Sequence, residues 1–254
     1  MMRTFHCVAA CLSALCLIFL ASSATAADDR RVLVFGDSNS WGWKPVAEGR
    51  PTSRYDDAER WPGILESRLG ATTTVVVDAL SGRTVDTAYE GTVGTLNGAA
   101  FDGAAALPAA IARELPLDLV IVMLGTNDAR SDLARDPADV AAGMCRIAEI
   151  VRSSAGGVFT TYPAPDLLVV VPPIIGDTSR TSISGVTVDA TARSDAIGNA
   201  IASAAARCDY EAFDAREVIE IETIDGVHLS SRDHERLGLM LAPLVTQMLE
   251  RKWQ

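Results

Sequence analysis

The sequence predicts an α/β fold with three layers, in which a parallel five-stranded sheet is covered by helices on both faces. Short apolar runs rich in β-branched residues have the length and composition of buried strands. They alternate with longer stretches of helical periodicity, and strands joined through helices pair in parallel with right-handed crossovers. The predicted strands are Val32–Phe35, Thr73–Ala79, Leu117–Leu124, Leu167–Val171 and Tyr210–Phe213.

The first half of the chain divides into clear strands, helices and loops. Pro- and Gly-containing residues 44–59 predict a loop, and residues 61–69 predict a helix because their apolar residues recur on one face. Residues 85–101 are rich in Gly and Thr and predict a second loop. An Ala-rich helix over residues 104–114 ends before a proline, and the strand at residues 117–124 is apolar on both faces and therefore central.

The second half continues the alternation. Pro137 suits the first turn of a helix that runs to about Ser153. Loops are predicted at residues 155–165 and 174–185, a long Ala-rich helix at residues 188–207 and a closing amphipathic helix at residues 231–252. His234 lies in that last helix among charged neighbours, so we predict that it is at the surface.

The first 26 residues have the features of a secretory signal peptide. Arg3 gives a positive start, an apolar stretch follows, and Ala24-Thr25-Ala26 is a small-residue cleavage site. The apolar stretch is short for a membrane span, which argues against an uncleaved anchor. We therefore expect cleavage after Ala26 and a secreted or periplasmic protein without stable membrane association. Residues 27–254 have the length of a single catalytic domain.

Charge and cysteine content limit the classes of partner, the disulfides and the metal sites that this chain can have. The whole chain has a net charge of −11, and the signal peptide removes no acidic residue. An acidic exported chain is a poor partner for nucleic acid. Of the five cysteines, Cys145 and Cys208 lie beyond the leader. They could pair in an oxidising compartment, but the sequence leaves this open. No Cys/His cluster has metal-ligand spacing, so we expect no metal and no cofactor.

Three short motifs stand at loop positions where an α/β sheet binds its ligands. Gly36-Asp37-Ser38 follows the first strand, Gly125-Thr126-Asn127-Asp128 follows the third, and Asp225-Gly226-Val227-His228 precedes the last helix. Each alone has a plain structural interpretation as a capped turn. Together with Gly82, which follows the second strand, they resemble the four blocks of the SGNH (GDSL-type) hydrolase superfamily, in family order.

The resemblance is to the arylesterase/acyltransferase branch, through Gly-Asp-Ser-x-x-Trp-Gly-Trp, Leu-Gly-Thr-Asn-Asp and the stretch Ala155–Pro165. It implies a flavodoxin-like sheet of strand order 2-1-3-4-5. Asn39-Ser40 stands where Leu-Thr is usual in that branch, so acyl preference does not carry over. The branch includes oligomers, which allows a homo-oligomer here.

The expected chemistry is nucleophilic catalysis by a serine. Ser38 would be the nucleophile and His228 its base, because His234 is the only other histidine beyond the leader. Asp225, three residues before His228, would orient the imidazole. The backbone N–H groups of Ser38 and Gly82 and the amide of Asn127 would form the oxyanion hole.

Other residues near the nucleophile receive supporting roles. We interpret Asp37 as structural, holding the turn by hydrogen bonds. Trp41 and Trp43 are more often core residues, but their position makes at least one of them a candidate wall for the acyl group, as is Val227.

The expected function is hydrolysis, and on the family's precedent also transfer, of short acyl groups from small or aryl esters. The alternatives are a carbohydrate O-acetyl esterase, a lysophospholipase or thioesterase with the same triad, and a silent binding domain on the same fold.

Overall fold

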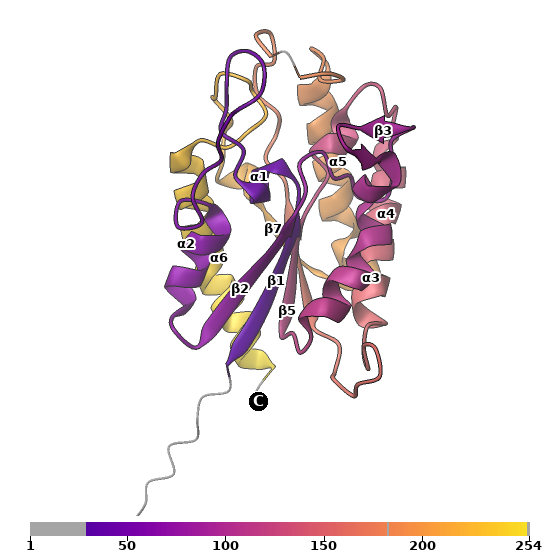
Figure 1. Cartoon of the computed structure of the whole chain (residues 1–254), viewed down its shortest axis with the longest axis vertical. Helices are drawn as coiled ribbons and strands as arrows, with labels where there is room; N and C mark the ends of the chain where they lie inside the picture. Colours follow the sequence, from indigo (N-terminus) through magenta and orange to yellow (C-terminus); the bar gives the residue numbers. More distant parts are fainter. Residues whose placement is uncertain (1–28, 182, 253–254) are drawn as a thin grey trace, which may run out of the picture.

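The computed structural model describes residues 29–181 and 183–252. The predicted signal peptide therefore lies outside the described residues. A single parallel sheet runs through the middle of the molecule, with strand order β2-β1-β5-β6-β7 (Figure 1). This confirms the predicted order of the five main strands. The strands are β1 (Arg30–Gly36), β2 (Thr73–Ala79), β5 (Leu119–Met123), β6 (Asp166–Val171) and β7 (Glu211–Asp214).

Helices cover both faces of this sheet (Figure 1). Side chains alternate between the faces of a strand. Val32 and Val34 of β1 consequently pack in the core under α2 and α6, whereas Leu33 and Phe35 pack in the core under α3, α4 and α5. The helices are α2 (Trp61–Leu69), α3 (Gly103–Glu114), α4 (Pro137–Arg152), α5 (Ala190–Cys208) and α6 (Ser231–Arg251).

The central strand and the helix ends show why the sequence folds this way. All five residues of β5 are buried, as expected for a strand with helices on both sides. Helix α4 begins where the Asp136 carboxylate accepts the N–H of Ala138 at 2.8 Å. Helix α6 begins with a capping box between Ser230 and Asp233, which satisfies orphan N–H groups of its first turn.

The structure adds short elements that the sequence did not indicate. The motif around Ser38 forms a four-residue helix, α1 (Ser38–Trp41). The predicted loop at residues 85–101 contains a small hairpin of β3 (Thr92–Val93) and β4 (Leu96–Asn97), followed by the 3₁₀ turn η1 (Gly98–Phe101). Two further 3₁₀ turns are η2 (Asn127–Ala129) and η3 (Ala215–Glu217).

Cys145 of α4 and Cys208 at the end of α5 form a disulfide, with their Cα atoms 5.1 Å apart. The sequence had left this pairing open, because helix periodicity does not specify which helices are neighbours.

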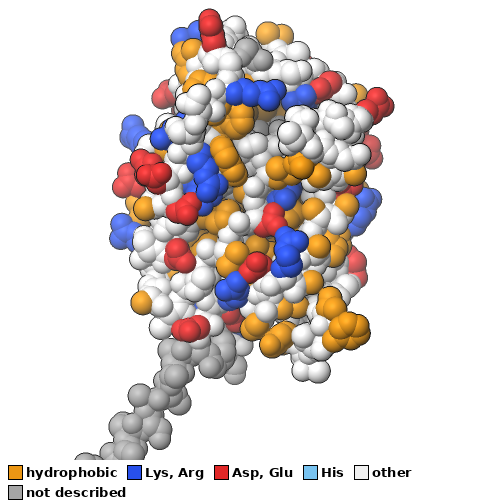
Figure 2. All heavy atoms as spheres, viewed as in Figure 1, with side chains coloured by type: hydrophobic (Ala, Val, Ile, Leu, Met, Phe, Trp, Pro, Cys, Tyr) orange, Lys and Arg blue, Asp and Glu red, His pale blue; other side chains and the backbone are white. Residues whose placement is uncertain are grey.

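The described surface carries charges of both signs. On the face drawn in Figure 2, acidic and basic side chains are interspersed. Among the described residues, no helix combines the length and apolarity that a membrane span requires.

His234 corrects one prediction: its side chain is fully buried, not at the surface. Its Nδ1 accepts the backbone N–H of Trp61 at 3.3 Å, and the Tyr55 ring packs edge-on at 5.0 Å. The charged neighbours misled the prediction, whereas the helical spacing from His234 to Leu237, Gly238 and Leu241 places it on the buried face. Burial, with the nearby charges of Arg60 and His228, lowers the pKa of His234 to about 3.

His234 is expected to make the fold acid-sensitive. Its pKa is about 3 in the fold but about 6.5 in the unfolded chain, so between these values only the unfolded chain binds the proton. The contribution of neutral His234 to the free energy of unfolding is complete above about pH 6.5. It falls as the pH drops, by roughly 2 kcal/mol at pH 5. We expect the unfolding free energy of the wild type, measured with urea, to fall by about this amount relative to that of His234→Asn between pH 7.5 and 5.

Comparing the wild type with His234→Asn separates the pH dependence due to His234 from that of other titrating groups. Burial raises the pKa values of Asp37 and Asp128 to about 7, and these carboxyls act in the opposite direction, losing stability as the pH rises towards that value. They are present in both proteins, so equal pH slopes for wild type and variant would refute the assignment to His234.

Candidate active site

Ser38 lies just beyond the carboxyl end of β1, where ligands bind in open α/β sheets. It is the first residue of α1 and is only 5% exposed. The carboxylate of Asp37 caps this helix by accepting the N–H of Asn39 at 2.9 Å. The Ser38 hydroxyl is therefore held on a short, capped turn at the rim of the sheet.

The structure brings His228 and Asp225 to Ser38. The His228 Nε2 is 3.1 Å from the Ser38 Oγ, and the His228 Nδ1 is 2.8 Å from the Asp225 Oδ2. The other oxygen of Asp225 accepts the backbone N–H groups of Val227 and His228, both at 3.0 Å. Burial would raise the pKa of Asp225, but the bonds to His228 and to the two N–H groups outweigh it, so this pKa is lowered.

The three predicted oxyanion donors follow three different strands. Ser38 follows β1, Gly82 follows β2 and Asn127 opens η2 after β5. Gly82 has a φ of +92°, and a Cβ there would lie 3.2 Å from the Phe101 ring, so this position requires glycine. The Asn127 Nδ2 donates to the Arg83 carbonyl at 3.0 Å and, more weakly, to the Asp37 Oδ2 at 3.4 Å.

Asp37 holds the turn by hydrogen bonds, as predicted. It is fully buried, and burial raises its pKa to about 7 despite the bond from Asn39 and the charge of Arg83. Its two oxygens contact α1 on one side and the Asn127 amide on the other. Asp37 thus connects two of the three strands that supply the site.

The candidate pocket residues separate in the structure. The Trp43 indole stacks on the His228 ring, with centroids 4.9 Å apart and planes 16° apart. Trp41 instead lines a cavity with Arg54 and Arg60. The Val227 side chain is buried in the core on the α3–α5 face of the sheet. Trp43 is therefore the aromatic residue that directly covers the imidazole.

Sequence reasoning missed the roles of two buried polar residues. The Asn39 side chain donates to the Val227 carbonyl at 3.3 Å and accepts the Leu229 N–H at 3.0 Å, so it grips the backbone on both sides of His228. The Arg83 guanidinium donates to the Gly36 carbonyl at 3.1 Å and to Asp78. A polar residue in place of the usual leucine after Ser38 was the available indication for Asn39; no pattern indicated Arg83.

The described residues contain no group of three or more His, Cys, Asp or Glu side chains that could hold a metal ion.

The fold and the side chains at its carboxyl edge are those of an α/β ester hydrolase. Residues 34–236 match the model of the GDSL-like lipase/acylhydrolase family. The chain belongs to this family and is a carboxylic ester hydrolase, which confirms the resemblance found in its motifs.

Solved structures agree with this assignment. An aryl esterase from M. smegmatis is 39% identical, with a TM-score of 0.79 over 86% of this chain and 99% of that one. Est24, a carbohydrate acetylesterase from Sinorhizobium meliloti, is also 39% identical, with a TM-score of 0.80 over the same shares. A putative arylesterase from Agrobacterium tumefaciens is 31% identical, with a TM-score of 0.72 over 86% and 99%. No curated protein sequence matches the chain.

Proposed function

We propose that Ser38, His228 and Asp225 form a catalytic triad that cleaves short acyl esters through an acyl-enzyme. The observation that carries the proposal is the chain of hydrogen bonds from Asp225 through His228 to Ser38, with contacts of 2.8 and 3.1 Å. A serine hydroxyl is a weak nucleophile until a base within hydrogen-bond reach removes its proton. His228 is within that reach, and Asp225 keeps a proton on the other ring nitrogen.

The reaction then has two balanced halves. The Ser38 oxygen attacks the ester carbonyl while the His228 Nε2 takes the hydroxyl proton, and the alcohol leaves with that proton as the acyl-enzyme forms. Water attacks the acyl-enzyme in the second half, His228 again takes and returns the proton, and the free acid leaves. An alcohol in place of water gives acyl transfer. The stacked Trp43 ring shields one face of the imidazole and leaves less room for water there.

The oxyanion of each tetrahedral intermediate meets three donors in this proposal. The Ser38 N–H is in the first turn of α1 and so has no carbonyl within the helix to receive it. The Gly82 N–H approaches the reacting carbonyl without a Cβ in the way. Asn127 contributes by exchanging its weak 3.4 Å contact with Asp37 for the oxyanion.

Small aryl and alkyl acetates are the first substrate class, and O-acetylated carbohydrates are the second. The similar solved structures include an aryl esterase and a carbohydrate acetylesterase at equal identity, which supports both classes. A lysophospholipase with the same triad is a weaker alternative, because the acidic chain is a poor match for anionic lipid surfaces. A thioesterase with the same triad is the other alternative.

A substrate panel tests the function. We expect p-nitrophenyl acetate to be cleaved with a higher kcat/KM than the octanoate ester or lysophosphatidylcholine, since the buried Ser38 and the Trp43 ring restrict the acyl side. Acetate release from acetylated sugars, measured in parallel with Ser38→Ala as the blank, ranks the second class. A preference for long acyl chains or phospholipid would contradict the assignment to short acyl esters.

Asn39 gives this proposal a sharper test. Asn39→Leu removes both bonds that flank His228, and small misplacements of catalytic groups cost about 10²-fold. We expect kcat to fall by about that factor with little change in KM, because substrate contacts remain. Asn39→Asp keeps the acceptor for the Leu229 N–H and should recover part of the rate. If KM alone changes, Asn39 acts on substrate binding instead.

We also propose that the protein acts outside the cytoplasm after cleavage at Ala26. The leader-like composition of residues 1–26 supports export. The Cys145–Cys208 disulfide supports an oxidising compartment.

A further inference from the structure

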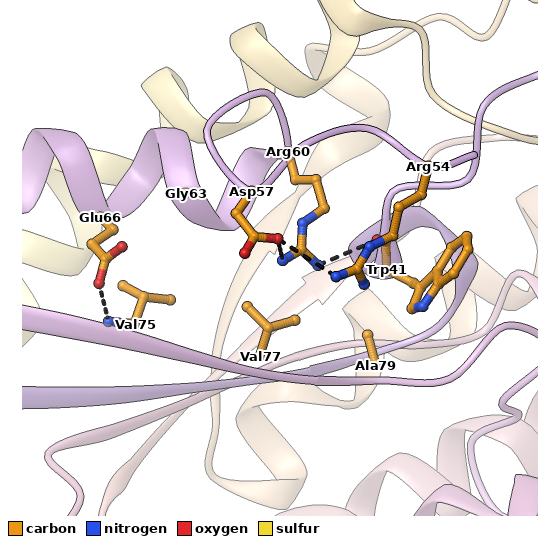
Figure 3. Close-up of a pocket in the computed structure, with 9 residues that line it drawn as sticks. All are labelled: Trp41, Arg54, Asp57, Arg60, Gly63, Glu66, Val75, Val77 and Ala79. Atoms are coloured by element: carbon orange, nitrogen blue, oxygen red, sulfur yellow. Dashed lines mark hydrogen bonds and ion pairs between the residues drawn. The ribbon is translucent and has the colours of Figure 1, made fainter.

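The cavity lined by Trp41, Arg54 and Arg60 lies beside α1, between α2 and the edge strand β2 (Figure 3). Its volume is about 320 Å³, which is within the range of small-molecule pockets. The side chains of Val75, Val77 and Ala79 point from β2 into it and form an apolar floor. Asp57 and Arg54 are 77% and 41% exposed, so the cavity is open to solvent on their side.

The wall opposite this floor is aromatic and charged. Trp41 and Arg54 stand at one end, with the guanidinium 5.2 Å from the indole centre, and Glu66 stands at the other (Figure 3). Asp57 lies between two arginines, 3.7 Å from Arg54 and in a short ion pair with Arg60. Arg60 also donates to the Ser40 and Trp41 carbonyls, so it ties this wall to α1.

The charges of the wall select the kind of ligand. Two guanidinium groups and two carboxylates balance, so an anion would meet Asp57 and Glu66 and a cation would meet Arg54 and Arg60. A neutral polyhydroxy compound can donate to the carboxylates and accept from the guanidinium groups. A sugar ring also has an apolar C–H face, which suits the valine floor and the Trp41 ring.

Trp41 links the lining of this cavity to the reacting groups. Trp41 is three residues after Ser38 on α1, and residues three apart are neighbours on a helix surface. The Trp41 and Trp43 ring centroids are 6.3 Å apart, and Trp43 in turn stacks on His228 at 4.9 Å. A ligand at the Trp41 end of the cavity therefore lies next to the aromatic cover of the imidazole.

We propose that this cavity is a subsite for a neutral saccharide, which holds the alcohol side of an O-acetylated sugar while its acetyl ester reaches Ser38. The proposal rests on the esterase function proposed above and assigns its substrate class. Arg54 is the residue that best tests it, because it contacts Trp41 and the cavity but does not hold α1 as Arg60 does.

The binding test uses the Ser38→Ala protein and the unacetylated disaccharide cellobiose. We expect cellobiose to shift the indole N–H resonance of Trp41, which the spectrum of Trp41→Phe identifies, whereas galacturonate and glucosamine shift it less. Loss of one charge-assisted hydrogen bond in Arg54→Ala should weaken Kd by about tenfold. Arg50→Ala is the matched control, an exposed arginine of the same loop outside the cavity lining. No shift with cellobiose, or an equal Kd in Arg54→Ala, would overturn the subsite.

A kinetic test separates the subsite from the triad. The ratio of kcat/KM for monoacetylated cellobiose to that for p-nitrophenyl acetate should fall about tenfold in Arg54→Ala and stay constant in Arg50→Ala. If p-nitrophenyl acetate cleavage depends on Ser38 but the ratio is unchanged, the subsite fails and the triad stands. If Ser38→Ala still cleaves p-nitrophenyl acetate, the triad fails, and the cellobiose shift alone decides the subsite.

Discussion

Replacement of Ser38 by alanine is expected to lower kcat on p-nitrophenyl acetate by about 10⁶-fold, and His228→Ala should do the same. The Ser38 Oγ and the His228 Nε2 are 3.1 Å apart and, in the proposed mechanism, act on the same proton, so removing either one stops the same step. The double variant should therefore be hardly slower than either single variant. Initial rates with the purified proteins measure all three.

Ser40→Ala is the matched control for the loss of a hydroxyl. Ser40 is in the same helix, is fully buried, and its Oγ has no hydrogen-bond partner among the described residues. This variant should keep its rate and its thermal transition. Losses in the Ser38 and His228 variants that multiply in the double variant would argue that the two residues serve separate steps.

Asp225→Asn is expected to lower kcat by about 10⁴-fold without unfolding the loop. The asparagine carbonyl can still accept the N–H groups of Val227 and His228, so the backbone is retained. Its amide, however, would donate to the His228 Nδ1. The imidazole then carries its proton on Nε2 and cannot accept the proton of Ser38.

Asp177→Asn controls for the loss of one carboxylate nearby. Asp177 is exposed, and its backbone packs against Gly226, which follows Asp225 in the sequence. We expect this variant to retain the wild-type rate. A wild-type rate in Asp225→Asn would mean that Ser38 and His228 act as a dyad.

The main strands and helices could be predicted from sequence because each has its own hydrophobic periodicity and is bounded by residues that end helices or strands. Asp136-Pro137 and the glycine after Leu69 indicate helix ends directly, and the all-apolar stretch of β5 indicates a central strand. The order of the strands came from family resemblance, since local periodicity contains no information on which strands are neighbours. The same limit explains why the disulfide stayed open.

The site was predictable where a motif fixes the backbone and unpredictable where side chains meet across the fold. The motifs located Ser38 and His228, which the structure places together. Asn39 forms hydrogen bonds to the loop around His228, and His234 is buried against Trp61. Both depend on contacts between residues more than 170 positions apart. No local pattern reports such contacts.

The proposed nucleophile and its base stand 190 residues apart in the sequence, near opposite ends of the described chain. The contacts that close this distance, from Asn39 to the His228 loop and from α2 to α6, form only when the last helix docks. A nascent or partly threaded chain carries Ser38 without a partner for its proton. Under the proposed triad, the topology thus makes ester cleavage a property of the finished molecule.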